Sequence, residues 1–128
     1  MVKAGAWGED AVQLHRFRGW DDVKISEGVP FSVIADDCML SETETRGRVH
    51  IRDSKNHLEW MCGDGEMSWK LKIDKKIAYN VGYGASRPLR EMFWHAEGME
   101  TAYSGEVIFQ GEKYLIELET CYGYADKN

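Results

Sequence analysis

The residue types best suited to proton chemistry gather in the last third of this 128-residue chain. His95 and Glu97 stand two positions apart, and Tyr124, Asp126 and Lys127 stand close to the final residue. A histidine moves protons near neutral pH, a carboxylate against aromatic walls has its pKa raised toward the role of an acid, and a tyrosine hydroxyl can orient a partner. Such a set could protonate an alkene, provided that the fold brings the two segments together.

A predicted hairpin lies between these two segments. Apolar and polar residues alternate over residues 106–109 and 113–118, and Gln110-Gly111-Glu112 supplies the turn. In an antiparallel hairpin, residues about equally far from the turn lie opposite one another. We therefore expect the His95 region to lie near the Tyr124 region.

The same residues carry a resemblance to a known family. The pattern WHAEGMETAYSG, a short hairpin and the ending YGYADKN resemble the lipocalin-related family of tocopherol cyclases and carotenoid 1,2-hydratases, especially its uncharacterised bacterial members. The resemblance covers residues 67–128, and its most specific piece is GYADKN, which in the family runs on into Trp-Gly. Family members are longer and have a pair of barrel-like domains, so the resemblance implies that this chain is one such unit or a truncated version.

The resemblance also implies a chemistry. Hydration or cyclisation in the family is thought to begin with protonation of an isoprenoid double bond, and a Tyr-x-Asp arrangement is associated with that step. The matching residues are Tyr124 and Asp126, with Trp94 and His95 as companions, and Asp126 is the expected proton donor. The ring faces of Trp94 and Tyr122 could stabilise a developing carbocation.

Residues 86–98 support two interpretations. Ser86 could cap a helix, Pro88 suits a first helical turn, and apolar residues at helical spacing lead to Gly98, which could end it, so local rules favour a helix over residues 86–98. The resemblance implies instead that residues 91–102 form a strand that carries the characteristic residues, which leaves at most one short helix near residues 86–92. We follow the resemblance here.

The rest of the chain has the pattern of short strands. Turn residues recur between alternating segments, and residues 66–73 alternate most clearly. Eight to ten short strands without a long helix are typical of an all-β sandwich or barrel. With the resemblance, we expect a single domain over residues 1–128: an antiparallel lipocalin-like (calycin-like) barrel or half-barrel preceded by an irregular arm at residues 1–10. His15 is expected to be a solvated strand residue, and Asp36-Asp37 a turn.

Composition narrows the classes of function. The net charge is −6, with 16 basic residues scattered among 22 acidic ones, which argues against a nucleic-acid partner. The chain has neither a stretch of the roughly 18 apolar residues that span a bilayer nor a signal-peptide core, so we expect a cytoplasmic protein without a membrane span. Cys38, Cys62 and Cys121 lack metal or disulfide spacing and are expected to be buried or half-buried. Four scattered histidines predict no metal site, and no cofactor is expected.

Three functions are compatible with these features. The first is binding of a small hydrophobic or isoprenoid-like molecule in a β-barrel pocket. The second is an acid/base hydratase-like or cyclase-like enzyme that uses Asp126, His95 and Tyr124. The third is an assembly domain, because a chain that stops within a strand motif leaves an edge that invites a homodimer or larger homo-oligomer. The expected ligand-binding residues are Trp60, Trp69, Trp94, Glu97, Tyr122 and Lys127.

Overall fold

The computed structural model describes residues 2–6, 8–9, 11–26, 31–52, 63–80 and 95–127. For residues 78–80, 95–99 and 125–127 it describes the backbone alone. These residues form antiparallel strands and one 3-10 turn, Trp20–Asp22. The strands are β1 (Val2–Ala6), β2 (Val12–Arg16), β3 (Val23–Ser26), β4 (Ser32–Ala35), β5 (Cys38–Ser41), β6 (Glu44–Ile51), β7 (Gly65–Asp74), β8 (Ile77–Asn80), β9 (His95–Phe109), β10 (Glu112–Ile116) and β11 (Tyr122–Lys127).

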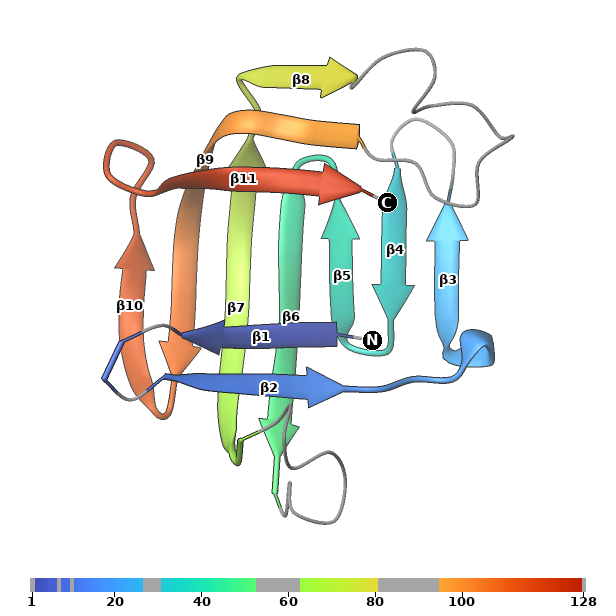
Figure 1. The fold of residues 1–128 in the computed structure, drawn as a ribbon, viewed down its shortest axis with the longest axis vertical. Helices are drawn as coiled ribbons and strands as arrows, with labels where there is room; N and C mark the ends of the chain where they lie inside the picture. The colour runs from blue at the N-terminus through green and yellow to red at the C-terminus, as the bar shows by residue number, and fades with distance from the viewer. Residues whose placement is uncertain are drawn as a thin grey trace.

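The strands form an open half-barrel. The main sheet has the order β10-β9-β7-β6-β5-β4-β3, and β8 and β11 also pair with β9 (Figure 1). β1 and β2 form a separate hairpin, and neither sheet closes on itself through the described strands. The predicted all-β antiparallel class is therefore confirmed, with eleven described strands where eight to ten were expected.

Strand β9 changes direction along its length, and its two parts pair with different strands. Its first part pairs with β8 and β11, and its second part pairs with β7 and β10. Figure 1 shows the first part of β9 running across the long strands before the chain turns to run along them. Glu100 in this strand has φ 55°, and Gly105 has φ 138°, a conformation that glycine adopts readily. A Cβ atom at Gly105 would collide with the carbonyl oxygen of Lys70, so this position requires glycine.

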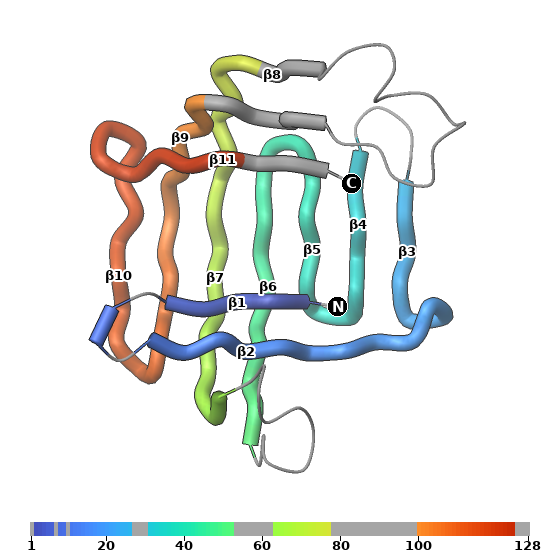
Figure 2. Tube along the Cα trace, in the orientation of Figure 1, coloured from blue at the N-terminus to red at the C-terminus, as the bar shows by residue number. Residues whose placement is uncertain are grey.

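The hairpin of β1 and β2 crosses the face of the main sheet, as the tube in Figure 2 shows. Its register runs from Val2 opposite Arg16 to Ala6 opposite Val12. The amide of Gly63 donates to the carbonyl oxygen of Gln13 at 2.9 Å and ties the hairpin to the start of β7. Burial of the fully enclosed Leu14 supplies the apolar attachment.

Two predictions for this region were wrong. Residues 1–10 were expected to be an irregular arm, yet Val2–Ala6 is a paired strand. His15 was expected to be solvated, but its side chain is only 5% exposed. In both cases the tertiary contact of the hairpin with the sheet decides the outcome, because the local sequence shows only a short alternation near glycines.

Other local predictions are confirmed. β7 is a strand as predicted, and its burial alternates from Trp69 to Asp74 with Ile73 buried, whereas Gly65 to Ser68 are all half-buried. Gln110 and Gly111 have φ 51° and 83° and form the two-residue turn between β9 and β10. This pair of positive φ values matches the twist of a hairpin. Asp36-Asp37 is a turn, and the short strand Cys38–Ser41 that follows it was not anticipated. The proposed helix near 86–92 lies outside the described residues, whereas residues 95–102 are strand, as the resemblance implied.

Candidate functional site

An apolar hollow of about 300 Å³ lies between the hairpin and one half of the main sheet. We name it the Trp69 hollow. Strands β3, β4 and β5 supply most of its wall, and Trp69 of β7 and Thr45 of β6 complete it. Apart from Arg18 and Thr45, the described lining residues are apolar: Val2, Val23, Val33, Ala35, Cys38, Met39, Leu40 and Trp69.

The indole of Trp69 is held by a short chain of hydrogen bonds. Its Nε1–H donates to the hydroxyl oxygen of Thr45 at 3.0 Å, and that hydroxyl donates to the carbonyl oxygen of Met39 at 3.0 Å. Gly47 lies beneath the ring, where a Cβ atom would come within 2.7 Å of the indole Cζ2 and of the Cys38 sulfur. The absence of a side chain at Gly47 therefore lets the indole lie close to the sheet.

Two arginines and two aspartates join the hairpin to the turn between β4 and β5. Arg16 Nη2 lies 2.5 Å from Asp37 Oδ1 and 3.6 Å from Asp36 Oδ2, while Arg18 Nε forms a close ion pair with Asp36 Oδ2. Arg16 also donates to the carbonyl oxygen of Arg48 at 2.9 Å. The hydrogen bond from Arg16 lowers the pKa of the Asp37 carboxyl. The sequence prediction that the two aspartates form a turn is confirmed, and the turn anchors the end of β2.

Cys38 lies under this group of charges. Its sulfur is 3.6 Å from the carbonyl oxygen of Arg48 and 3.7 Å from Asp37 Oδ1. Burial raises the pKa of the Cys38 thiol, and the residue forms part of the wall of the hollow. Cys38 is buried and Cys121 is half-buried, as predicted, and Cys62 lies outside the described residues.

A second, larger hollow of about 970 Å³ lies near the turn of the hairpin, at the other end from Val2 and Arg18, against β7, β9 and β10. Its floor includes Met67, Val107 and Phe109. Two carboxylates and an amide line it as well, from Glu9, Glu112 and Gln110. It is therefore less suited to a purely apolar molecule than the Trp69 hollow.

The sequence predicted that the His95 region would lie near the Tyr124 region, and the backbone confirms this. Strand β11 runs antiparallel to the first part of β9, so Lys127 lies opposite His95 and Asp126 lies opposite Ala96. Asn80 of β8 lies opposite His95 on the other side. Glu97 lies in the same part of β9. The side chains of these residues are outside what the structure describes.

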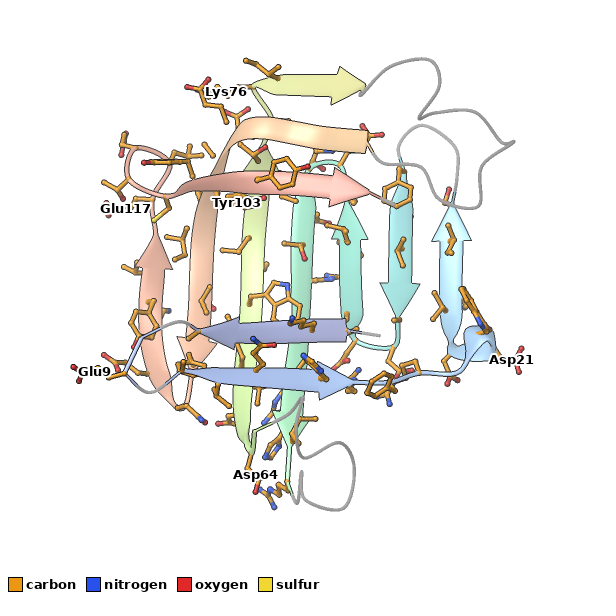
Figure 3. All side chains as sticks on the ribbon, viewed as in Figure 1. Glu9, Asp21, Asp64, Lys76, Tyr103 and Glu117 are labelled. Atoms are coloured by element: carbon orange, nitrogen blue, oxygen red, sulfur yellow. The ribbon has the colours of Figure 1, made fainter. Side chains whose placement is uncertain are left out.

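The tyrosines of β11 lie at the surface. Tyr122 is 80% exposed and Tyr124 is 49% exposed. The hydroxyl of Tyr103 donates to the carbonyl oxygen of Tyr124 at 3.5 Å, and Figure 3 shows Tyr103 beside β11. Partial burial raises the pKa of the Tyr103 phenol. Of the expected ligand-binding residues, only Trp69 and Tyr122 have side chains that the structure describes; Trp69 lines the Trp69 hollow and Tyr122 does not. The side chains of Trp60, Trp94, Glu97 and Lys127 lie outside the described set.

Sequence reasoning missed three residues that shape the hollow. Arg18, Thr45 and Gly47 stand in polar or glycine-containing stretches that resemble surface segments. Their roles depend on partners far along the chain, so a pattern of neighbouring residues contains no signal for them. A glycine within an alternating strand is the one partial clue, since it often marks a close approach of another group.

The described residues contain no group of three or more His, Cys, Asp or Glu side chains that could hold a metal ion. Nor does this part of the chain contain a helix long and apolar enough to cross a membrane. The fold and hollow define an open antiparallel β half-barrel with an apolar recess under a crossing hairpin. Comparison with protein-family models, with curated proteins and with solved structures finds no match. The resemblance to the tocopherol cyclase and carotenoid hydratase family thus stays a prediction.

Proposed function

We propose that this protein binds a small apolar molecule in the Trp69 hollow. The observation that carries the proposal is the composition of the wall, where eight of the ten described lining residues are apolar. Small-molecule sites commonly have volumes of roughly 300–1,000 Å³, mostly apolar walls and a few placed polar groups. The hollow, at about 300 Å³, lies at the small end of that range. A medium-length alkyl chain or a short isoprenoid fits this description better than a large fused-ring molecule.

The hydrogen bonds of the wall support a binding role. The indole N–H of Trp69 donates to the hydroxyl oxygen of Thr45, so the ring presents a rigid apolar face to the hollow and no unpaired N–H group. A rigid aromatic wall loses little conformational entropy when a ligand binds. A ligand would cover part of the indole and displace water from apolar surface, which is favourable by about 25 cal/mol per Å².

Tryptophan fluorescence tests the proposal. Titration with decanol and geraniol should change the emission saturably, because Trp69 lines the hollow. The chain contains five tryptophans, so Trp69→Phe is the matched control: it should remove most of the change while calorimetry still detects binding. The absence of both a spectral change and binding heat for either ligand would refute the proposal.

A second candidate function is acid/base chemistry on such a ligand, as the family resemblance suggests. The observation in its favour is the β9–β11 register, which sets the backbone of Asp126 and Lys127 against Ala96 and His95. Asp126→Asn should abolish turnover of an isoprenoid alkene and leave unfolding unchanged. Asp74→Asn, a change at an exposed carboxylate on β7, is the control. Equal turnover by the Asp126→Asn variant and the unmodified protein would exclude Asp126 from the mechanism.

We also propose that the protein self-associates as a homodimer or larger oligomer. β10 lies at one end of the main sheet, and its Leu115 is 70% exposed. Strand edges with exposed apolar side chains favour pairing with another copy. Light scattering should report a dimer that Leu115→Lys converts to a monomer; a monomer at micromolar concentration before any substitution would contradict this.

A further inference from the structure

From the donors and acceptors of the Trp69 hollow, and on the condition that the hollow binds a ligand as proposed above, we infer that its ligand is an amphiphile with a carboxylate at one end. The carboxylate would lie against Arg18, and the apolar body would extend along Trp69 and β3–β5. Three observations lead to this inference. They are the charge of the lining residues, the hydrogen-bond partners of their donor groups, and the partial exposure of Arg18.

Among the described residues that line the hollow, Arg18 is the one with a charged side chain. The nearby carboxylates of Asp36 and Asp37 do not belong to the lining. A ligand in the hollow would therefore meet apolar surface nearly everywhere and a guanidinium at one place. Guanidinium groups bind carboxylates through two parallel N–H···O bonds, which are about twice as strong as bonds between neutral groups.

The other polar hydrogens of the lining already have acceptors. Trp69 donates to Thr45, Thr45 donates to the Met39 carbonyl, and the Cys38 sulfur lies within reach of two oxygens. Arg18 differs from these groups. Its Nε faces Asp36, and Nη1 donates to the carbonyl oxygen of Phe17 at 3.3 Å. A guanidinium has five N–H donors, so within the described part of the chain the remaining donors on Nη1 and Nη2 are uncommitted.

The polar group that the lining offers to a ligand is therefore a hydrogen-bond donor, the guanidinium of Arg18. A ligand with an acceptor at its end satisfies Arg18, whereas an ammonium group would be repelled by it and a purely apolar end would leave its donors to water. The Arg18 side chain is 29% exposed, so part of it stays in contact with solvent while the residue lines the hollow. A carboxylate there stays partly hydrated while the chain behind it is buried, so the cost of desolvating the charge is small.

Asp36 provides an internal competitor that makes the inference testable. Its carboxylate occupies Arg18 Nε and offsets part of the guanidinium charge. Removing that charge should therefore strengthen the binding of an acidic ligand. Asparagine suits the replacement because Asp36 has φ 54°, a left-handed conformation that asparagine tolerates.

The experiment compares decanoate, decanol and decylamine by calorimetry. Decanoate should bind about tenfold more tightly than decanol, and decylamine most weakly. Arg18→Met keeps the apolar stem without the donors, so it should weaken decanoate by about tenfold and leave decanol unchanged. Asp36→Asn should tighten decanoate by about threefold, again without effect on decanol.

Each alternative outcome has a distinct meaning. Equal affinity of the three ligands for the unmodified protein would overturn the carboxylate inference while leaving the proposed apolar site intact. A parallel loss of decanoate and decanol binding in both variants would show that the Arg18–Asp36 pair serves the fold alone, which also overturns the inference. Failure of all three ligands to bind the unmodified protein would refute the proposed function itself.

Discussion

Replacement of His15 by leucine should stabilise this protein. The His15 side chain is 5% exposed, and neither ring nitrogen has a hydrogen-bond partner among the described residues. A neutral imidazole has one donor and one acceptor, and a buried polar group without a partner costs about 1–3 kcal/mol. Leucine removes both polar atoms at a position beside the fully buried Leu14. We expect a net gain of about 1–2 kcal/mol, which corresponds to a rise in Tm of about 4–8 °C.

Thermal and urea unfolding of three variants test this reasoning. His15→Leu should raise the unfolding midpoint, while His15→Gln, which keeps polar atoms at the site, should not. His50→Leu is the matched control on β6, because His50 is exposed and accepts a hydrogen bond from Arg52 Nε at 3.0 Å. It should change the stability by less than about 0.5 kcal/mol. A lower midpoint for His15→Leu would refute the argument, since it would show that the imidazole makes a favourable interaction.

Three other substitutions have defined expectations. Gly47→Ala should cost about 1–3 kcal/mol in urea unfolding and shift the tryptophan emission, because the new Cβ lies 2.7 Å from the Trp69 ring; an unchanged spectrum would contradict this. Gly105→Ala should cost about 3 kcal/mol, since φ is 138° and the Cβ would overlap a β7 carbonyl oxygen. Asp37→Asn should lower stability at neutral pH by up to about 1 kcal/mol. Because the hydrogen bond from Arg16 lowers the pKa of Asp37, this difference should be complete above the ordinary value of 3.8 and vanish as pH falls through the folded-state pKa; a difference that persists in acid would contradict the ion-pair explanation.

Much of the local structure was predictable from the order of residues. The alternation of β7 and the turn at Gln110 and Gly111 depend on side-chain period and on backbone conformations that a few residues can specify. The approach of β11 to the start of β9 followed from the antiparallel return of the chain, and the register confirms it for the backbone. The alternation and the turn require information from neighbouring positions only, and the β9–β11 approach requires in addition the direction in which the hairpin returns the chain.

The apolar hollow could not be predicted in the same way. Arg18 belongs to the exit of β2 and Trp69 to β7, and they line one space only because the β1–β2 hairpin crosses the sheet. The same crossing buries His15, which the local pattern assigned to the solvent face.

By itself, then, the sequence determined most of the strands, though not β1 or β5, together with the main turns and the all-β class, because strand period and turn chemistry are local properties. The tertiary structure alone decided which of the arginines, tryptophans and histidines face a common interior. The physical reason is that burial and ion pairing depend on contacts between distant segments, and those contacts exist only once the hairpin has packed across the sheet.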